Sequence, residues 1–164
     1  MPEIATERLL VITFEAEMMT ALLEGTEKLE KLIPYKVPVK YPMDVYKQFF
    51  PYKIKRFSQY PEENKWEGLI IDKENQTVIG DIGYKEGPNE KGEINLGYSI
   101  LSRYQGKGYA TEAALAMVKW GLSQPDVQKI TATCSPENLA SIRVLEKAGL
   151  RQTHKDEKKI YWLS

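Results

Sequence analysis

The chain has 164 residues, and its 23 basic and 23 acidic side chains give a formal net charge of +0. Hydrophobic residues make up 42% and charged residues 28%, which is typical of a globular protein and excludes a disordered one. The balanced charge argues against a nucleic-acid-binding protein, and the short apolar runs exclude a membrane-spanning helix. The first residues lack the basic start and apolar run of a signal peptide, so we expect a cytoplasmic protein with one domain, residues 1–164.

Cysteine and histidine are nearly absent. The single Cys134 excludes an internal disulfide, and the lone His154 argues against a histidine-based metal site, so we expect no bound metal. Cys134 ends a predicted strand and is interpreted as a buried, inert side chain.

Apolar, β-favouring runs predict seven strands, at residues 8–12, 66–72, 77–85, 93–100, 129–134, 150–154 and 159–163. The early strands suggest an antiparallel meander. The later strand-helix-strand-helix order indicates one parallel crossover in a mixed α+β sheet.

Helical spacing of apolar residues predicts two short helices within residues 15–33, the second capped by Thr26. Residues 44–60 are also helical in pattern, with a break or a fresh start at Pro51. Further helices are expected at residues 106–122 and 136–148, the last one ended by Gly149. Residues 33–62, which are rich in proline and aromatic residues, are interpreted as a variable surface element over one end of the sheet.

A glycine turn lies between the strand at 93–100 and the next helix. Arg103, Gly106 and Gly108 form the pattern Arg-x-x-Gly-x-Gly, with Lys107 between the glycines. Helix N-termini carry unpartnered N–H groups, and glycines let an anion approach the backbone, so the turn suits a phosphate or pyrophosphate. The P-loop pattern is absent, and the third glycine of a dinucleotide fingerprint is replaced by Thr111.

At this point the sequence resembles the GNAT superfamily of acyl-CoA-dependent N-acyltransferases, whose pyrophosphate loop has this form. It is most similar to the branch that includes the ribosomal-protein N-terminal acetyltransferases. The matching segments are Thr6-Glu7-Arg8-Leu9-Leu10, Ile79-Gly80-Asp81-Ile82-Gly83, Gly97-Tyr98 with residues 106–113, and the helix from Glu137 to Gly149.

The resemblance implies a mostly antiparallel sheet of about seven strands with one splayed parallel pair, flanked by about four helices. It also implies acetyl-CoA as co-substrate. Backbone and side chains expected to hold it are Ser99, Ile100, Leu101, Arg103, Gly106, Lys107, Gly108, Tyr109, Ala110, Asn138 and Arg143. The alternative interpretation of Asn138 is a plain helix cap.

The family pattern places Ser141 at the thioester sulfur, where it would assist the leaving group. The tyrosine that many relatives carry four positions later is Leu145 here. Relatives often have a glutamate two residues before the Gly-Tyr pair. Here that position is Asn95, which can only orient water or substrate, and Glu93 on the same strand face is the substitute candidate base.

We therefore expect an N-acetyltransferase that acts directly on a primary amine, with a protein or peptide N-terminus among the open acceptors. Because Asn95 and Leu145 replace common catalytic side chains, a catalytically silent acyl-CoA sensor is the alternative. A nucleotide-binding module that shares only the glycine turn is a third. The oligomeric state, monomer or homodimer, stays open.

The zero net charge is unevenly distributed, with −4 over residues 1–100 and +3 over residues 101–151. The positive excess coincides with the segment expected to hold a highly charged cofactor. The negative excess lies on the half expected to shape the acceptor site, where an amine arrives as a cation.

Overall fold

The computed structural model describes residues 3–164, and these build one sheet of eight strands in the order β1-β2-β3-β4-β5-β6-β8-β7. Among these strands only β5 and β6 run parallel; every other neighbouring pair is antiparallel. The strands are β1 (Ile4–Ala5), β2 (Leu9–Thr13), β3 (Glu67–Asp72), β4 (Thr77–Lys85), β5 (Glu93–Ile100), β6 (Lys129–Cys134), β7 (Arg151–Lys155) and β8 (Ile160–Leu163).

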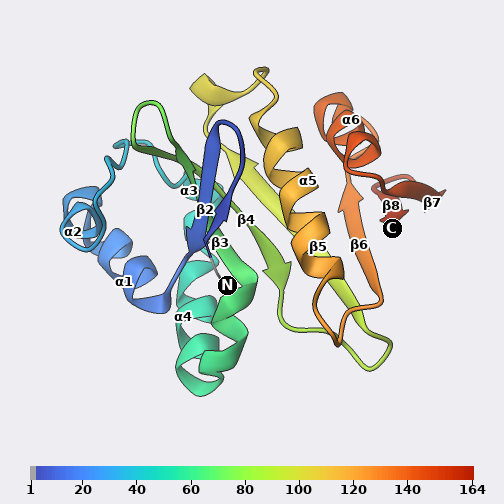
Figure 1. The fold of residues 1–164 in the computed structure, drawn as a ribbon, viewed down its shortest axis with the longest axis horizontal. Helices are drawn as coiled ribbons and strands as arrows, with labels where there is room; N and C mark the ends of the chain where they lie inside the picture. The colour runs from blue at the N-terminus through green and yellow to red at the C-terminus, as the bar shows by residue number, and fades with distance from the viewer. Residues whose placement is uncertain (1–2) are drawn as a thin grey trace.

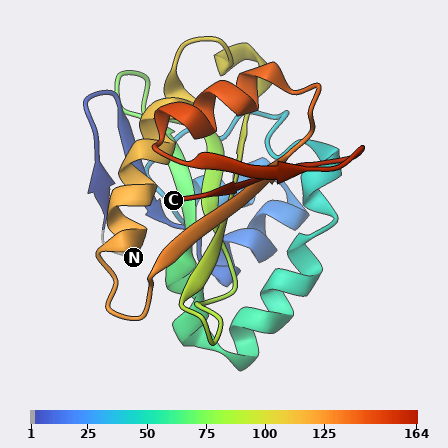
Figure 2. The same cartoon turned by 90° about the vertical axis from the view of Figure 1, so that its right-hand side faces the viewer.

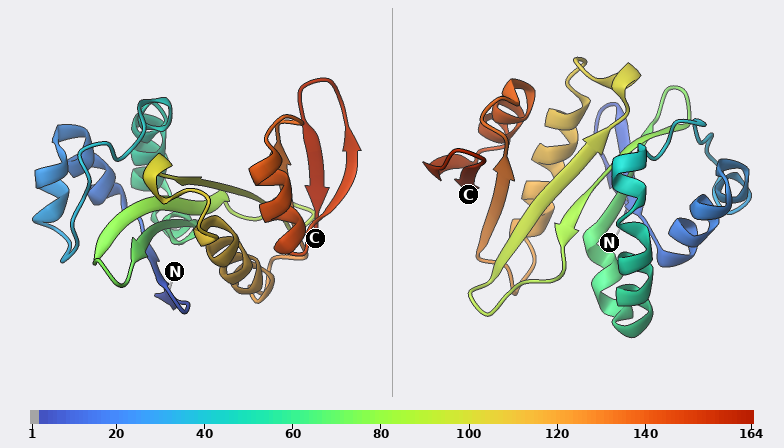
Figure 3. Two further views of the ribbon diagram at one scale, coloured as in Figure 1. Left: turned by 90° about the horizontal axis from the view of Figure 1, so that it is seen from above. Right: turned by 180° about the vertical axis from the view of Figure 1, so that it is seen from behind.

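Six α-helices and two 3₁₀ turns connect the strands within this part of the chain. They are α1 (Ala16–Glu24), α2 (Thr26–Glu30), α3 (Asp44–Lys47), α4 (Phe50–Gln59), η1 (Pro61–Trp66), η2 (Ser102–Tyr104), α5 (Tyr109–Leu122) and α6 (Leu139–Lys147). Helix α5 covers one face of the sheet, whereas α4, packed on α1, covers the opposite face (Figures 1 and 3). No helix among residues 3–164 is long and apolar enough to cross a membrane.

The mixed α+β class, the antiparallel meander and the single parallel pair are confirmed. The sheet has one strand more than expected, because the two-residue β1 pairs with β2, and short helices raise the helix count. Pro51 lies in the first turn of α4, which confirms the fresh start there. The expected cap at Thr26 is wrong: Gly25 is the N-cap, and Thr26 is the first residue of α2.

The parallel pair is short. Strands β5 and β6 pair only at Glu93–Lys129, Ile94–Ile130 and Asn95–Thr131, after which β6 continues along β8 and β5 continues along β4. The two strands therefore separate beyond Asn95 and leave a gap between their C-terminal halves. Helix α6 and the loop before α5 lie together at this end of the sheet (Figure 2).

Strands β4 and β5 approach each other closely at the C-terminal end of β5. Gly80 opposes Ile100, and a Cβ at Gly80 would lie 2.1 Å from the carbonyl oxygen of Ser99. Only glycine allows this contact, because the backbone it would strike cannot swing aside as a side chain can. Close packing of the two strands therefore explains why Gly80 of the Ile79–Gly83 motif is a glycine.

We predict that Gly80→Ala lowers the free energy of unfolding by about 1–3 kcal/mol, as overpacking against a fixed neighbour does. Urea denaturation measures the change. The control is Gly97→Ala on the next strand, where a Cβ meets no atom within 4 Å. Equal stability of the two variants would contradict a close β4–β5 contact.

Candidate active site

A cavity of about 430 Å³ opens where β5 and β6 separate, and we call it the strand-gap cavity. Its walls come from the end of β5, the glycine loop, the start of α5 and the first turns of α6. The cavity brings together nine of the residues expected from the sequence: Ser99, Ile100, Gly106, Gly108, Tyr109, Ala110, Asn138, Ser141 and Arg143. Lys147, one turn beyond Arg143, adds a second cation.

The glycine loop presents backbone to this cavity. Gly106 and Gly108 have φ values of 77° and 82°, a conformation that side chains with a Cβ rarely adopt. A Cβ at Gly106 would meet nothing within 4 Å, so the loop faces open space. The first α5 amides, Tyr109 to Thr111, have no intrahelical carbonyl to bind, and they mark the positive end of the helix. The loop therefore fits a phosphate-bearing ligand.

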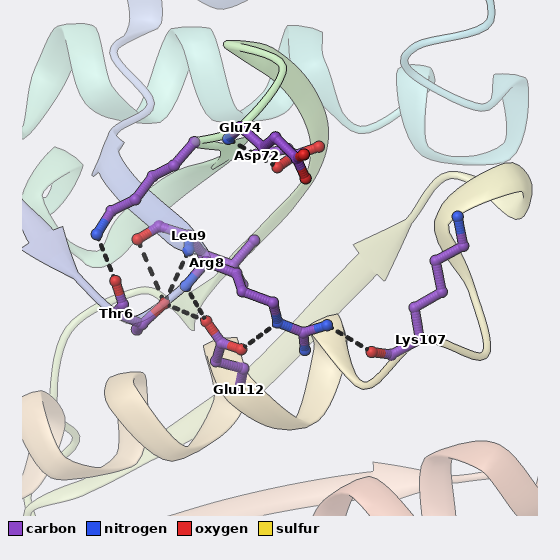
Figure 4. A network of polar contacts seen from close by, with 8 residues as sticks. Thr6, Arg8, Leu9, Asp72, Glu74, Lys107 and Glu112 are labelled. Carbon is purple, nitrogen blue, oxygen red and sulfur yellow. Dashed lines mark hydrogen bonds and ion pairs between the residues drawn. The ribbon is translucent and has the colours of Figure 1, made fainter.

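A hydrogen-bonded network ties this loop to the first long strand (Figure 4). The Glu112 carboxylate accepts hydrogen bonds from the backbone N–H and the Nε of Arg8, each at 2.8 Å, and from the Thr6 hydroxyl. Nη1 of Arg8 donates to the carbonyl of Lys107 at 2.9 Å. Because that carbonyl lies between the two glycines, Arg8 holds the loop from behind.

The same contacts shift the ionisation of Glu112. Partial burial favours its neutral form, but the hydrogen bonds from Thr6 and Arg8 outweigh burial and lower the pKa of Glu112 below its ordinary value. Glu112 therefore stays ionised at neutral pH and keeps the Arg8 guanidinium in place.

Backbone groups of β5 face the gap. The N–H of Leu101 donates to Ile79 on β4, so by alternation the neighbouring Ile100 directs its carbonyl away from β4. The side-chain amide of Gln105 donates to that carbonyl at 2.8 Å. A strand edge that takes a side-chain amide in place of a strand partner suits a ligand that carries amides itself.

Ser141 lines the strand-gap cavity and is held there by two contacts. Its backbone N–H donates to Oδ1 of Asn138 at 3.0 Å, so Asn138 caps α6 and also lines the cavity. The Ser141 hydroxyl lies 2.6 Å from the phenol of Tyr98 on β5. Burial raises the pKa of Tyr98, which keeps the phenol protonated at neutral pH.

A second cavity of about 410 Å³, the sheet-face cavity, lies between α4 and the sheet. Buried Glu67 and half-buried Asp81 line it from β3 and β4, and Lys53 and Phe57 line it from α4. Tyr46 and Tyr98 line both cavities, so the two spaces meet at these two rings. Because Tyr46 and several α4 side chains form the walls, residues 33–62 supply part of the site as well as surface.

Some expected residues lie elsewhere. Arg103 and Lys107 line a third cavity with Lys36, on the other side of Tyr104. Leu101 is buried and binds β4 through its N–H. These residues flank the strand-gap cavity without lining it.

The two acid-base candidates on β5 lie outside both cavities. Asn95 and Glu93 share a strand face with Gly97, which lines the sheet-face cavity, but they lie about 7 and 14 Å farther along the strand. The Asn95 amide donates to Oγ1 of Thr131 at 2.9 Å, which spans the last paired position of the parallel strands. The structure does not bring either side chain to the place where the cavities meet.

Tyr98, Asp81 and Glu67 line these cavities but are not among the site residues expected from the sequence. Tyr98 belongs to the Gly-Tyr pair quoted for the resemblance, directly before the loop. Asp81 is a carboxylate within the apolar run Val78–Ile82, and a charged residue at such a position is a signal that sequence alone offers.

Comparison with known proteins agrees with this geometry. Residues 8–151 match the family model of the acetyltransferase (GNAT) domain, so the chain belongs to the GNAT family of acetyl-CoA-dependent N-acetyltransferases. An uncharacterized N-acetyltransferase of Bacillus subtilis, YjdG, is 28% identical over 96% of this chain and 95% of its own length.

Solved structures show the same fold. A GNAT-family acetyltransferase from Bacillus anthracis is 25% identical, with a TM-score of 0.67, over 99% of this chain and 97% of its own. The structural neighbours include a ribosomal α-N-protein acetyltransferase in complex with coenzyme A, at 13% identity and a TM-score of 0.68, over 99% of this chain and 97% of its own. At that identity the second likeness shows the fold alone.

We predict that Glu112→Gln weakens acetyl-CoA binding about fivefold, because about 1 kcal/mol of loop anchoring is lost with the ionised hydrogen bonds. The variant also unfolds more easily at pH 7. Because the pKa of Glu112 is lowered in the folded protein, its ionised form contributes stability above the unfolded-state pKa. This contribution is lost as the pH falls through the folded-state pKa, so the stability difference between wild type and variant should shrink and vanish in acid. Calorimetry and urea titrations at several pH values test both points. Exposed Glu146→Gln is the control, and a Kd that stays constant would contradict the anchoring role.

We predict that Gly108→Val raises the Kd for acetyl-CoA at least about a hundredfold, because a branched side chain strains the loop at φ 82° and covers its amides. The matched control is Gly149→Val after α6, where φ is 94° and a Cβ meets no atom within 4 Å. Both variants should lose stability, but only Gly108→Val should lose the ligand. Equal acetyl-CoA affinity for the two would place the pyrophosphate elsewhere.

Proposed function

We propose that this protein transfers the acetyl group of acetyl-CoA directly to a primary amine, without a covalent enzyme intermediate. The observation that carries the proposal is the meeting of the strand-gap cavity and the sheet-face cavity at Tyr98. The strand-gap cavity offers groups that can bind phosphates and amides, and the sheet-face cavity offers carboxylates and aromatic rings. The two cavities are adjacent. This arrangement suits a donor and an acceptor that react face to face.

The strand-gap cavity supplies what an acetyl-CoA molecule needs. The loop amides with Arg143 and Lys147 would hold the pyrophosphate, and the free edge of β5 around Ile100 would pair with the pantetheine amides. Arg103 and Lys107 in the neighbouring cavity add positive charge nearby. When bound, the thioester supplies the activated acetyl group.

The residues around Ser141 can manage the leaving group. As the new C–N bond forms, the C–S bond breaks and its electron pair goes to sulfur, which then needs a proton or a hydrogen-bond donor. The Ser141 and Tyr98 hydroxyls, 2.6 Å apart, form a donor pair for that position. An N–H of the β5 edge near Ile100 would polarise the thioester carbonyl. The proton that the amine loses leaves on the acceptor side.

A protein or peptide N-terminus is the acceptor that we favour. A structural neighbour acts on the α-amino group of a ribosomal protein. An α-amino group has a pKa of about 7.7–8.0, so a sizeable fraction is already neutral at physiological pH. The cytoplasm, where such acceptors occur, is the location that fits this proposal.

The silent-sensor alternative rests on Asn95 and Leu145. The structure weakens this alternative, because Tyr98 of β5 places a phenol beside Ser141. A proton donor is therefore present although position 145 is not a tyrosine. A wild-type protein that binds acetyl-CoA tightly and releases no thiol with any amine would favour the sensor.

The test is the release of free thiol from acetyl-CoA in the presence of peptides with free N-termini, polyamines, amino acids and aminoglycosides. We expect turnover with at least one peptide and a mass increase of one acetyl group on its N-terminus. No turnover across the panel together with no acetyl-CoA binding would remove the proposal.

We predict that Ser141→Ala and Tyr98→Phe each lower kcat by about 10- to 1000-fold, because removing one proton donor from a pair typically costs that much. The KM for acetyl-CoA should change little, since neither hydroxyl reaches the loop. Ser135→Ala, on the loop before α6 and outside both cavities, is the control. Unchanged kcat in both site variants would exclude this donor pair.

A further inference from the structure

Two carboxylates form the floor of the sheet-face cavity. Strand register puts Glu67, Gly83 and Gly97 in one row across β3, β4 and β5, and Leu69, Asp81 and Ser99 in the next row on the same face. Gly97 leaves open space above its Cα, because a Cβ there would meet nothing within 4 Å. Room for a substrate group therefore exists directly beside both acids.

The charge on this floor is unbalanced. Nζ of Lys53 lies 3.1 Å from Oε1 of Glu67, whereas Asp81 has no ion pair among residues 3–164. Oδ2 of Asp81 instead accepts a hydrogen bond from the phenol of buried Tyr41 at 2.6 Å, and Ser99 adds another. Two carboxylates thus face one ammonium group, which leaves one negative charge without a cation.

The surroundings make this unpaired charge costly. Burial raises the pKa of Asp81, although the bonds from Tyr41 and Ser99 and the charge of Lys53 oppose it. Burial also raises the pKa of Glu67, against the attraction of Lys53. An ammonium group entering the cavity would supply the missing positive charge.

We propose that Asp81 and Glu67 bind the ammonium group of the acceptor, and that the cavity selects primary amines that carry no carboxylate beside the amine. Asp81 then accepts one proton: R–NH₃⁺ and the carboxylate become R–NH₂ and the carboxylic acid, and the nitrogen lone pair is free toward Tyr98. The proposal rests on the proposed function, because it names the acceptor class of the same site.

The exclusion of carboxylates results from the two acids on the floor and from the pairing of two lining cations, Lys53 and Arg56. Lys53 is engaged by Glu67, and Arg56 is held by Glu63 through two hydrogen bonds of 2.7 and 2.8 Å. On the floor, a free α-carboxylate would therefore meet the two acids. Lys85, the lining cation without an ion pair among the described residues, lies two residues beyond Gly83 on β4 and is exposed. A peptide N-terminus or an amino-acid amide has no such carboxylate.

The cavity walls indicate which group of the acceptor lies next to its amine. Phe49 and Tyr52 line the cavity from the α3–α4 segment with exposed fractions of 51% and 60%, and Phe57 lies deeper. Large aromatic side chains left this exposed at a cavity favour an apolar or aromatic group on the substrate. The acceptor class is thus an amine that carries an apolar side chain and an uncharged amide.

The first experiment compares phenylalaninamide with phenylalanine as acceptors for the wild-type enzyme. We expect a kcat/KM at least tenfold higher for the amide, and a dipeptide amide should behave like it. The two compounds differ also in the amine pKa, so the comparison is made at a pH where both amines are largely protonated, which is the form that Asp81 and Glu67 bind. Equal rates there would overturn the selection against carboxylates.

The second experiment uses Asp81→Asn, which keeps the acceptor atom for Tyr41 and removes the charge. We expect the KM for the amine to rise and kcat/KM to fall about a hundredfold, with acetyl-CoA affinity unchanged in calorimetry. In the wild type, activity should fall as the pH drops through the pKa of Asp81, whose carboxyl group lies near Tyr41, Lys53, Glu67 and Ser99. In the variant this limb should be replaced by one at the pKa of the free amine, because only the neutral amine can then react. Exposed Asp126→Asn is the matched control.

Thermal melting distinguishes a variant that loses activity from one that fails to fold. Because burial raises the pKa of Asp81, its ionised form costs stability at pH 7, and Asp81→Asn should melt no lower than the wild type. Glu67→Gln is the second variant, with exposed Glu62→Gln as its control.

The outcomes are distinct. If the wild type neither binds acetyl-CoA nor acetylates any amine, the proposed function fails. If the wild type is active and Asp81→Asn keeps its amine KM and its acid limb, the inference alone fails. A loss of activity in Glu93→Gln with none in Asp81→Asn would likewise overturn it in favour of the β5 candidate.

Discussion

The short parallel pairing of β5 with β6 is the constraint on which the site depends. Three residue pairs hold the strands together, and beyond Asn95 each strand runs along its antiparallel neighbour on the other side. The backbone edge near Ile100 consequently has no strand partner and takes a hydrogen bond from Gln105. A gap of this kind is unfavourable in an empty protein and favourable for a ligand with amides, so the cost of the open edge and the capacity to bind have one origin.

The other parts of the site are positioned around that gap. Gly80 lets β4 lie close to β5, directly beside the paired residues Asp81 and Ser99. From the far side, Arg8 holds the glycine loop through the Lys107 carbonyl. Strand register and one ion pair thus shape both the strand-gap cavity and the sheet-face cavity, although the residues involved are far apart in the chain.

Local sequence signals were sufficient to predict the glycine loop and the elements on either side of it. The glycine spacing, the strand before it and the helix after it predicted the loop. Ser141 was selected from the family resemblance rather than from a local signal. Side-chain direction at the loop was not predictable, because Arg103 and Lys107 turn to the far side of Tyr104.

The residues that line the sheet-face cavity were harder to predict, for a different reason. Alternation along β5 correctly put Glu93 and Asn95 on one face, but it could not give the distance between that face and Ser141. Only the register across three strands brings Asp81 and Glu67 to the cavity, and register depends on contacts of residues distant in sequence. The phenol of Tyr98 was missed likewise, since its partner Ser141 lies 43 positions later.

Tyr46 and Tyr98 form a common wall between the two cavities, and this has a thermodynamic consequence. A ligand that moves either ring changes the space available to the other ligand. Any resulting change in affinity must be equal in both directions, because the free-energy cycle closes. Two ligands bound in these cavities would therefore be coupled through one shared surface.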